Sequence, residues 1–499
     1  MSLDEYLDNF DPVALVQRAN TLIDGRWLAT PCLLITGWAI WDICYNLYIS
    51  PLSRFPGPKL WAVSRIPYQW SIMRGQSHRK MLEMHNRYGA VLRVGPDELS
   101  FNSPQAFQDI YRARPGRPQY QKDPKFYGSL LNAVRRSIVG NLDDKTHSRH
   151  RRLLANAFSE RAMREQEGTV LYYSDLLVRR LRERTAVDEE KKHTIKTDIK
   201  EWFNFIAFDV TGDLLFAETF DCLEESKLHP WIALIFAFVK GIALAGVINQ
   251  FLLLRKMQEW FLPEKLRKQM MEHLNYSSEK ADRRLTKGTE RPDFIISIAG
   301  SETSATTLSG CVYFLSKHPE TLKKLNDEIR AAFTNDSDIT AAICARLPYL
   351  NAVIEETLRL YPPVAASLPR VVPNGGDVVD GYAVPEKTIV STHHYASYHA
   401  DANFALAEEF IPGRWLGTDP RFEADKRSVL QPFSLGQRGC LGKNLAYMES
   451  RLILTKLLFN FDIELCPESQ GWIVQEMYVN WDKPPLHVWL KDRIAVSSQ

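Results

Sequence analysis

Apolar residues recur every three or four positions along much of this chain, which is the spacing of one face of an α-helix. The pattern is clearest at residues 106–114, 149–158, 169–184, 320–333, 350–361 and 448–461. Shorter stretches rich in β-branched and aromatic residues favour strands instead, at residues 90–101, 378–391 and 486–490. The chain is therefore predicted to be mainly α-helical with small β-sheets.

An apolar run near the N-terminus, residues 27–49, is long enough to span a membrane as a helix. The run is imperfect: Asp42 lies off-centre in it, and a carboxylate near mid-bilayer would cost roughly 2.5–3.5 kcal/mol. Basic residues dominate 50–80, whereas acidic residues dominate 1–26, so the positive-inside rule predicts a luminal segment (1–26), an anchor (27–49) and a cytosolic remainder. A signal peptide would need a basic start and a small-residue cleavage site, which are missing here. A buried core helix is the other alternative.

The segment after this run, "SPLSRFPGPK" at residues 50–59, contains three prolines. Proline prevents a continuous helix and favours an extended backbone. We expect a stiff basic link that holds a globular domain against a membrane, although an ordinary interdomain linker has the same composition. Residues 60–499 show no later shift in composition and no repeat, so they are interpreted as one domain.

Composition and charge limit the possible functions. The chain has 499 residues, of which 45% are hydrophobic and 24% charged, as in globular proteins. Its 62 basic and 60 acidic residues give 62 − 60 = +2, so the overall charge gives no support to nucleic-acid binding. The seven cysteines include no C-x-x-C pair, which argues against a disulfide framework or a structural zinc site and favours a reducing compartment.

Cys440 lies in an unusually small-residue stretch, "FSLGQRGCLGKN" at 433–444. A cysteine in such a loop could be a nucleophile, which needs a nearby base, or a zinc ligand, which needs further ligands nearby. Iron in a porphyrin needs only one axial ligand, and cysteine is a known one. Gly436 and Gly439 would then permit turns, and Gly442 would let the backbone approach a flat ring. Arg438 could pair with a carboxylate of that ring.

The second motif is "ETLR", in which Glu356 and Arg359 lie three residues apart on a predicted helix and can pair. Arg414, in "EEFIPGRW", is a second candidate cation for Glu356. A buried glutamate between two arginines would be a rigid charged lock. A solvated surface pair is the simpler interpretation of this spacing alone.

The third motif, "AGSETSATT" at 299–307, places hydroxyl residues between two apolar stretches. Such hydroxyls can bond to helix carbonyls and distort a helix locally. Glu302 with Thr303 would form a small proton-delivery site that faces an apolar cavity. The alternative is a helix N-terminus capped by Ser301.

The fourth motif is the basic cluster "KTHSRHRR" at 145–152. On a helix, His147 and Arg151 share one face, while Arg149 and Arg152 point elsewhere. One face could bind ring carboxylates and the other could meet an acidic electron-donor protein. Clusters of this kind are otherwise solvated surface.

Together these motifs resemble the cytochrome P450 family, from the N-terminal run to the C-terminus. The resemblance implies that Cys440 is the haem-iron ligand. It assigns to the haem loop Phe433, Gly436, Arg438 and Gly442, and to a structural triad Glu356, Arg359 and Arg414. It assigns to the oxygen-activation segment Ala299, Gly300, Glu302 and Thr303, and to the haem propionates His147, Arg151 and Arg370. "FPGPK", "RPGRPQY" and "LPYLNAVIEETLRLYPPV" look like fungal secondary-metabolism members, of which the isotrichodermin C-15 hydroxylase group is the one we can suggest.

That family implies the cytochrome P450 fold with an N-terminal membrane anchor in the endoplasmic reticulum, haem b as the cofactor, and monooxygenation. NADPH–cytochrome P450 reductase would supply electrons, and one atom of O2 would enter an apolar, terpenoid- or polyketide-like small molecule. Glu302 and Thr303 would be the catalytic residues that relay protons. By the same resemblance, residues 101–121, the region before 250 and residues 365–368 would line the substrate pocket.

One departure concerns the helix that carries "AGSET". Related fungal members have considerably more sequence between an "RPDF"-like segment and this motif, whereas here "RPDF" at 291–294 runs directly into "IISIAGSET". The helix is predicted to lie within residues 293–318, a span of roughly 39 Å at 1.5 Å per residue. A truncated coding sequence and a reshaped pocket both explain this. Three hypotheses follow: a monooxygenase, a haem-thiolate protein of weak or no activity, and a haem-free thiol nucleophile.

Overall fold

The structure is a computed structural model of the 499-residue chain. It describes residues 25–127, 137–186, 194–229 and 294–493, together with the isolated residues 232, 241, 243, 246–251 and 268. The predicted luminal segment and residues 291–293 of "RPDF" therefore lie almost entirely outside the described residues.

Helices make up most of the described chain, which confirms the predicted mainly α fold. The six helical segments predicted from the apolar spacing are all helical: α7 (Pro104–Tyr111), α10 (Asp144–Ala155) with the short 3-10 turn η2 (Asn156–Phe158), α11 (Glu160–Ala186), α18 (Pro319–Ala332), α20 (Pro348–Leu360) and α22 (Lys443–Asn460). The hydroxyl-rich motif lies inside α17 (Phe294–Lys317). Smaller helices that the pattern analysis did not single out are α4 (Lys59–Val63), α5 (Ile66–Met73), α6 (Ser77–Tyr88), α8 (Pro124–Tyr127), α13 (Cys222–Glu225), α19 (Ala341–Cys344) and α21 (His394–Tyr398).

Two small sheets collect strands from distant parts of the chain. The larger sheet has the order β1-β2-β8-β5-β3, from β1 (Val91–Gly95), β2 (Glu98–Phe101), β8 (Ile389–Thr392), β5 (Arg370–Val371) and β3 (Gln121–Lys122). The second sheet has the order β4-β12-β9, from β4 (Thr194–Asp198), β12 (His487–Asp492) and β9 (Phe461–Leu465). Two hairpins, β6 (Asp377–Val379) with β7 (Tyr382–Val384) and β10 (Glu476–Met477) with β11 (Trp481–Asp482), complete the strands. All three predicted strand regions are thus confirmed.

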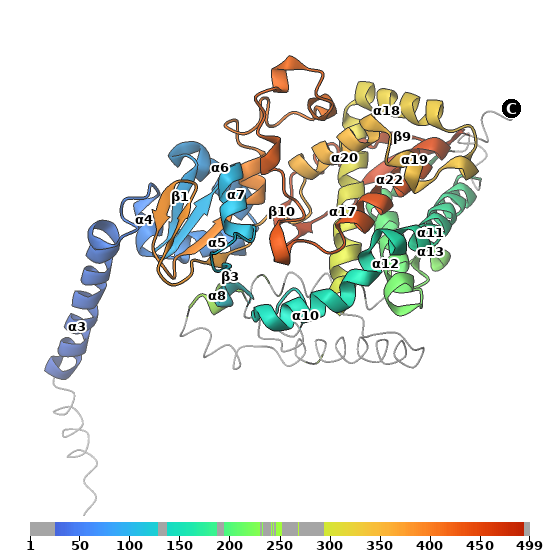
Figure 1. The fold of residues 1–499 in the computed structure, drawn as a ribbon. Helices are drawn as coiled ribbons and strands as arrows, with labels where there is room; N and C mark the ends of the chain where they lie inside the picture. The colour runs from blue at the N-terminus through green and yellow to red at the C-terminus, as the bar shows by residue number, and fades with distance from the viewer. Residues whose placement is uncertain are drawn as a thin grey trace, which may run out of the picture.

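The arrangement separates a sheet-rich side from a helix-rich side (Figure 1). The larger sheet lies with α6 and α7 next to the N-terminal helix, and the long helices α11, α12, α17, α18 and α22 gather on the opposite side (Figure 1). α12 (Ile199–Phe216) packs along α17 and buries residues around most of its circumference, as expected of a helix in the middle of a large core. This packing holds the hydroxyl-rich motif of α17 inside the protein.

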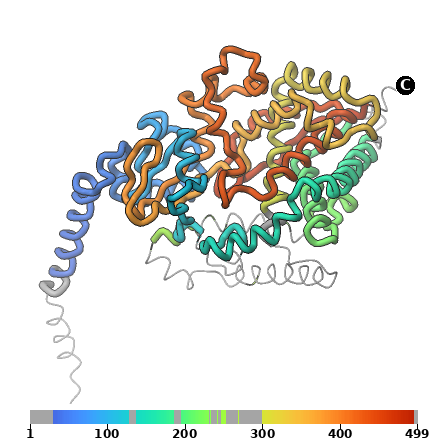
Figure 2. The backbone as a smooth tube through the Cα atoms, in the orientation of Figure 1, coloured from blue at the N-terminus to red at the C-terminus, as the bar shows by residue number. Residues whose placement is uncertain are grey.

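The N-terminal helix stands away from the body of the protein (Figure 2). It consists of α3 (Gly25–Cys44) followed by the π-helical turn η1 (Tyr45–Ile49). By length and composition, the helix over Thr30–Ile49 could cross a membrane, and only 6% of the 18-residue stretch on which this rests is buried. The proline-rich segment that follows forms turns, and its Leu52 and Phe55 are buried in the core of the sheet-rich side. This segment is therefore packed against the domain along part of its length.

Several histidines are buried near the larger sheet and hold neutral rings. Burial lowers the pKa of His78 to about 3, and it lowers the pKa values of His85 and His394 to about 4. In His85 one ring nitrogen contacts the carbonyl of Gly89 at 2.9 Å and the other contacts the hydroxyl of Ser100 at 2.9 Å. The unfolded chain binds protons on these rings below about pH 6.5, whereas the folded chain does not.

Acidification should therefore destabilise the fold. The contribution of each depressed histidine is complete above about pH 6.5 and is lost as the pH falls toward about 4. Between pH 7.5 and 5, we expect His85 alone to account for about 2 kcal/mol of the loss. Unfolding free energies of wild type and His85→Gln at both pH values test this, because the difference between the two pH dependences isolates His85. Equal losses in the two proteins would contradict the assignment.

Candidate functional site

Cys440 lies in a loop between the 3-10 turn η8 (Gly436–Arg438) and α22. The loop closes on itself, since the Cys440 amide donates to the Phe433 carbonyl at 2.7 Å. Gly436 has φ of +70°, and a Cβ there would lie 2.2 Å from the Tyr111 carbonyl oxygen, so glycine is required. Gly439 has an ordinary φ of −62°, but a Cβ there would lie 3.1 Å from the Gly436 carbonyl oxygen, so the tight turn favours glycine at this position too. A Cβ at Gly442 would meet only Phe158, at 3.7 Å.

The thiol of Cys440 is exposed although much protein surrounds it. Burial by that surrounding protein raises its pKa, while the Gly442 amide and the cations Arg151 and Lys443 act in the opposite direction. The charged neighbours that act on this thiol are thus cations and not bases, which favours a ligand role over a nucleophile activated by a base. No cluster of three or more metal-binding side chains occurs among the described residues, so a zinc site has no support there.

α10 attaches the predicted propionate residues to this loop. Its N-terminus is capped by Asp143, whose carboxylate accepts from the Thr146 amide at 2.7 Å. Arg151 then donates to the Gly439 carbonyl at 2.7 Å. Arg438 forms an ion pair with Asp144 at 2.6 Å. The structure therefore brings α10 and the cysteine loop together through two arginines.

Two further cations lie close by, on the edge of the larger sheet. Lys122 of β3 is directly opposite Arg370 of β5, and both side chains are buried. One terminal nitrogen of Arg370 has no hydrogen-bond partner among the described residues. Burial, together with Arg370 and Arg438, lowers the pKa of Lys122 to about 6. Burial, followed by Arg438, Lys122 and Arg151, lowers the pKa of His147 to about 4. Like charges opposite one another on neighbouring strands destabilise a sheet, so this cluster fits a bound group with carboxylates.

Lys122 did not stand out in the sequence. It lies in "YQKDP", where nothing in the spacing of charges marks it. Only the pairing of β3 with β5 places it against Arg370.

The proton-delivery candidates lie within α17, where Glu302 is buried and Thr303 is partly exposed. The Thr303 hydroxyl donates to the Ala299 carbonyl at 2.6 Å, and the Thr306 hydroxyl donates to the Glu302 carbonyl at 2.8 Å. The predicted hydroxyl–carbonyl bonds are therefore present, but the helix stays α-helical throughout, without a local distortion. Ser301 lies seven residues inside α17 and is not its N-cap. Glu302 forms an ion pair with Lys483, a residue that the sequence analysis did not consider.

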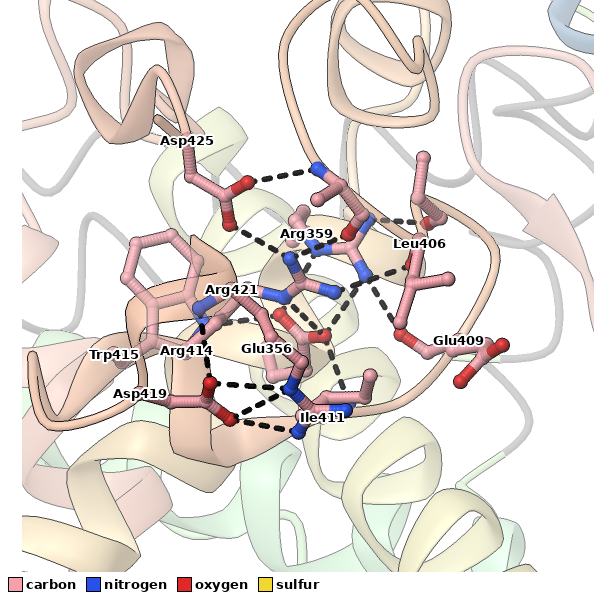
Figure 3. Close-up of polar contacts among 12 residues, drawn as sticks. Glu356, Arg359, Leu406, Glu409, Ile411, Arg414, Trp415, Asp419, Arg421 and Asp425 are labelled. Carbon is pink, nitrogen blue, oxygen red and sulfur yellow. Dashed lines mark hydrogen bonds and ion pairs between the residues drawn. The ribbon is translucent and has the colours of Figure 1, made fainter. Parts of the chain in front are cut away.

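The predicted triad is a fully buried charged network (Figure 3). Both guanidinium nitrogens of Arg359 that face Glu356 donate to it, at 2.8 and 2.9 Å, and Arg414 donates to it at 2.9 Å. All three side chains are 0% exposed. Burial alone would raise the pKa of Glu356, but the two arginines outweigh burial and lower it. The structure adds Trp415, whose indole donates to Glu356 at 2.9 Å, and Asp425, which pairs with Arg414 at 2.7 Å.

Removing one member of this network should be costly. We expect Glu356→Gln to lower the free energy of unfolding by about 3–5 kcal/mol, because Arg359 stays buried without its counter-charge and Arg414 keeps only Asp425. Denaturant unfolding measures this. The exposed pair Lys323–Asp327 offers a control: Asp327→Asn should cost less than about 1 kcal/mol. Equal effects of the two substitutions would contradict the structural importance of the buried network.

Removing one member of the cation pair Lys122–Arg370 should, in contrast, stabilise the haem-free chain. In haem-free protein at pH 5, where Lys122 with its pKa of about 6 is charged, Lys122→Met should raise the unfolding free energy by about 0.2–1 kcal/mol, because it removes a like-charge contact. In haem-loaded protein, the same substitution should speed haem transfer to apomyoglobin several-fold, because a carboxylate partner is lost. Lys125→Met, on the same segment but partly exposed and paired with the exposed side chain of Asp97, is the control and should change both quantities little. A Lys122→Met protein that is destabilised and retains haem normally would refute the interpretation.

Comparison with known proteins gives a consistent picture. The cytochrome P450 family model matches residues 56–295 and 293–488, which cover most of the chain. The chain is 40% identical to cytochrome P450 monooxygenase astJ of Aspergillus oryzae, over 91% of this chain and 94% of that protein. It is 38% identical to averantin hydroxylase of Dothistroma septosporum, over 99% and 98% of the two chains. It is also 38% identical to trichothecene C-15 hydroxylase of Fusarium sporotrichioides, over 90% and 95%.

These findings confirm the predicted family and the predicted similarity to fungal C-15 hydroxylases. They also show that the chain is shorter than one relative in its interior. The alignment with averantin hydroxylase covers 533 positions, so at least 533 − 499 = 34 of them have no residue in this chain. The two stretches of the family match meet at residues 293–295, just before Ala299 of the "AGSET" motif. The chain belongs to the cytochrome P450 family and is an oxidoreductase of that family.

Proposed function

We propose that this protein is a haem-thiolate monooxygenase of secondary metabolism that inserts one oxygen atom from O2 into an apolar small molecule. The observation that carries the proposal is the combination of an exposed thiol in a glycine loop with buried cations around that loop. Neither the exposed thiol nor the opposed cations Lys122 and Arg370 stabilise the chain by themselves, whereas a haem with two carboxylates would use both. Family membership supports haem with a cysteine-ligated iron, and haem b is the form we propose.

The residues around the site have distinct proposed roles. Cys440 would ligate the iron, and the Gly442 amide would stabilise the charge of its sulfur. The propionates would be bound by a set of cations and polar groups: Arg438, Arg151, Arg370, His147 and Lys122. When bound, the haem supplies the oxygen-activation chemistry. The protein then has to position the substrate, exclude water and deliver protons.

Proton delivery is proposed for Glu302 and Thr303. Glu302 is buried and ion-paired, and its neighbour Thr303 has a hydroxyl that already donates to the Ala299 carbonyl. A carboxylate next to a hydroxyl can pass a proton that it takes from solvent, because each group both accepts and donates in turn. Electrons would come from NADPH through NADPH–cytochrome P450 reductase.

The N-terminal helix is the proposed membrane anchor. Residues Thr30–Ile49 have the required length, and large apolar side chains such as Leu33, Trp38 and Trp41 are exposed on it. In water such a surface is unfavourable, whereas a bilayer would cover it. We therefore propose a single-pass protein of the endoplasmic reticulum with residues 60–499 in the cytosol.

Cysteine ligation can be tested by spectroscopy. The reduced, CO-bound wild type should show the red-shifted Soret band that is characteristic of a thiolate ligand, and Cys440→Ala should lose it. Cys44→Ala, which changes an exposed cysteine in the N-terminal helix, should keep the band. A normal band and normal NADPH-dependent product formation in Cys440→Ala would refute the proposal. A folded, haem-supplemented wild type without the band would refute it too.

A second candidate function is a haem-binding protein with impaired turnover. The observation in its favour is the short spacing in the sequence, where only "IISI" at 295–298 separates "RPDF" from Ala299. The break in the family match falls at the same place.

Two measurements separate the two candidates. A CO spectrum of the thiolate type, combined with NADPH consumption that yields no oxygenated product from any apolar test compound, would favour the impaired protein. Product formation would exclude it. Sequencing the transcript over the codons for residues 285–305 decides whether the short spacing belongs to the natural message.

A further inference from the structure

Lys483 is a buried lysine that meets the proposed proton-delivery residue from the far end of the chain. Its side chain is 5% exposed, and that of Glu302 is 4% exposed. The Lys483 ammonium donates to one carboxylate oxygen of Glu302, Oε1, and to the Thr306 hydroxyl at 2.6 Å. The Thr306 hydroxyl in turn donates to the Glu302 main-chain carbonyl at 2.8 Å. The ammonium is therefore fixed between two groups of α17 one helical turn apart.

The backbone around Lys483 is held rigidly. Lys483 follows β11 directly, and two prolines, Pro484 and Pro485, come after it. On one side the Trp481 indole donates to the Pro362 carbonyl at 2.8 Å, and on the other the Leu486 amide donates to Asp198 at 2.8 Å. The lysine is thus presented to α17 by a segment that cannot easily move.

The carboxylate of Glu302 is held by only one of its two oxygens. Oε2 is buried and has no hydrogen-bond partner among the described residues. A buried carboxylate oxygen without a donor is costly, and such atoms in native proteins call for an explanation. An oxygen that has to take up and release a proton needs to stay free of fixed donors.

We propose that Lys483 is a positioning residue for Glu302, which pins Oε1 so that Oε2 remains available as the proton-carrying atom. This inference rests on the proposed function, because it deepens the role proposed there for Glu302. In each transfer Oε2 takes up one proton from water and releases one toward Thr303, so the carboxylate returns to its starting form. The electrons that reduce O2 come from NADPH and do not pass through this pair.

The electrostatic surroundings set the direction of the expected effects. Burial lowers the pKa of Lys483, Glu302 raises it, and Lys200 of α12 lowers it further. Burial, and after it the negative charge of Glu302, raises the pKa of Tyr361, which directly follows α20. Glu449 of α22 bonds to Ser304 at 2.7 Å and belongs to the same buried region. Without the ammonium, Glu302 would be a carboxylate buried without its counter-ion, and its protonated form would be favoured.

The pair can be tested without turnover, by infrared difference spectroscopy of the folded protein. K483M should show a protonated carboxylic acid band at pH 7 that wild type lacks, and the band should disappear in K483M/E302Q. The background from Glu449, whose pKa burial raises to about 7, cancels because it is common to all three proteins. K483R, which keeps the positive charge, should resemble wild type. Glu302 still ionised in K483M, or an equal band in K483R, would overturn the inference.

A functional measurement distinguishes the positioning of Glu302 from a purely structural role of Lys483. With reductase and NADPH, the pH profile of NADPH oxidation should shift upward by about one pH unit or more in K483M and stay in place in K483R. Lys456 offers a matched control, since it is 3% exposed and paired with Asp175 and Asp336, whose side chains are 56% and 35% exposed. K456M should be destabilised, but it should show neither the acid band nor the shifted profile. An equal shift in K456M would overturn the inference.

The remaining outcomes are also decisive. If K483M does not fold, K483M/E302Q should fold, because removing both charges of a buried pair is far less costly than removing one. Failure of both variants to fold would show that Lys483 supports the fold and would overturn the positioning role.

The single variant E302Q tests Glu302 itself. An E302Q protein with the wild-type pH profile of NADPH oxidation would exclude Glu302 from proton delivery, and would overturn this inference with it. A wild type without the thiolate-type CO spectrum would refute the proposed function, while the infrared result would still decide whether Lys483 controls Glu302.

Discussion

Glu356 is a carboxylate with no exposed surface, and the fold around the cysteine loop depends on how its charge is neutralised. Arg359 and Arg414 bind it, and Arg359 also donates to the main-chain carbonyls of Tyr398 and Glu409, at 3.0 and 2.9 Å. These bonds attach the irregular segment 398–425 to α20, although that segment has little regular structure of its own. A buried charge gives this attachment its specificity, because any other arrangement would leave an ion unpaired in the protein interior.

The same segment leads into the cysteine loop. The Tyr398 hydroxyl accepts from the Gln431 amide at 3.0 Å, two residues before Phe433, whose carbonyl accepts from the Cys440 amide. The position of the thiol therefore depends on the triad through a short chain of bonds. The cations around the loop are arranged differently. Glu356 neutralises its partners, whereas Lys122 faces Arg370 across a strand pair, and neither forms an ion pair with an acid among the described residues. We infer that the first cluster stabilises the chain and the second is built for a ligand.

α17 combines apolar core packing with a buried charge in one helix. Its packing against α12 belongs to the main core, while Glu302 brings a second buried charge into that core. That charge is paired with Lys483, a residue 181 positions further along the chain. In the sequence, few residues lie between the break in the family match at 293–295 and the proton-delivery motif at 299–307. Any change of the pocket in this protein is thus expected on that side, away from the cysteine loop.

The sequence by itself determined the helices with one apolar face, the three strand regions and the family. Apolar spacing is a local property, and "FSLGQRGCLGKN" is specific because glycine and cysteine are required by local backbone and ligand chemistry. α12 was not singled out, because a helix buried on nearly all sides has no polar face to give it a period. Lys122 and Lys483 were missed for a different reason. Each has an ordinary sequence context, and its meaning comes from a partner far away in the chain, Arg370 for one and Glu302 for the other. Only the tertiary structure decided these contacts, because the energy of a buried charge depends on which groups surround it in space.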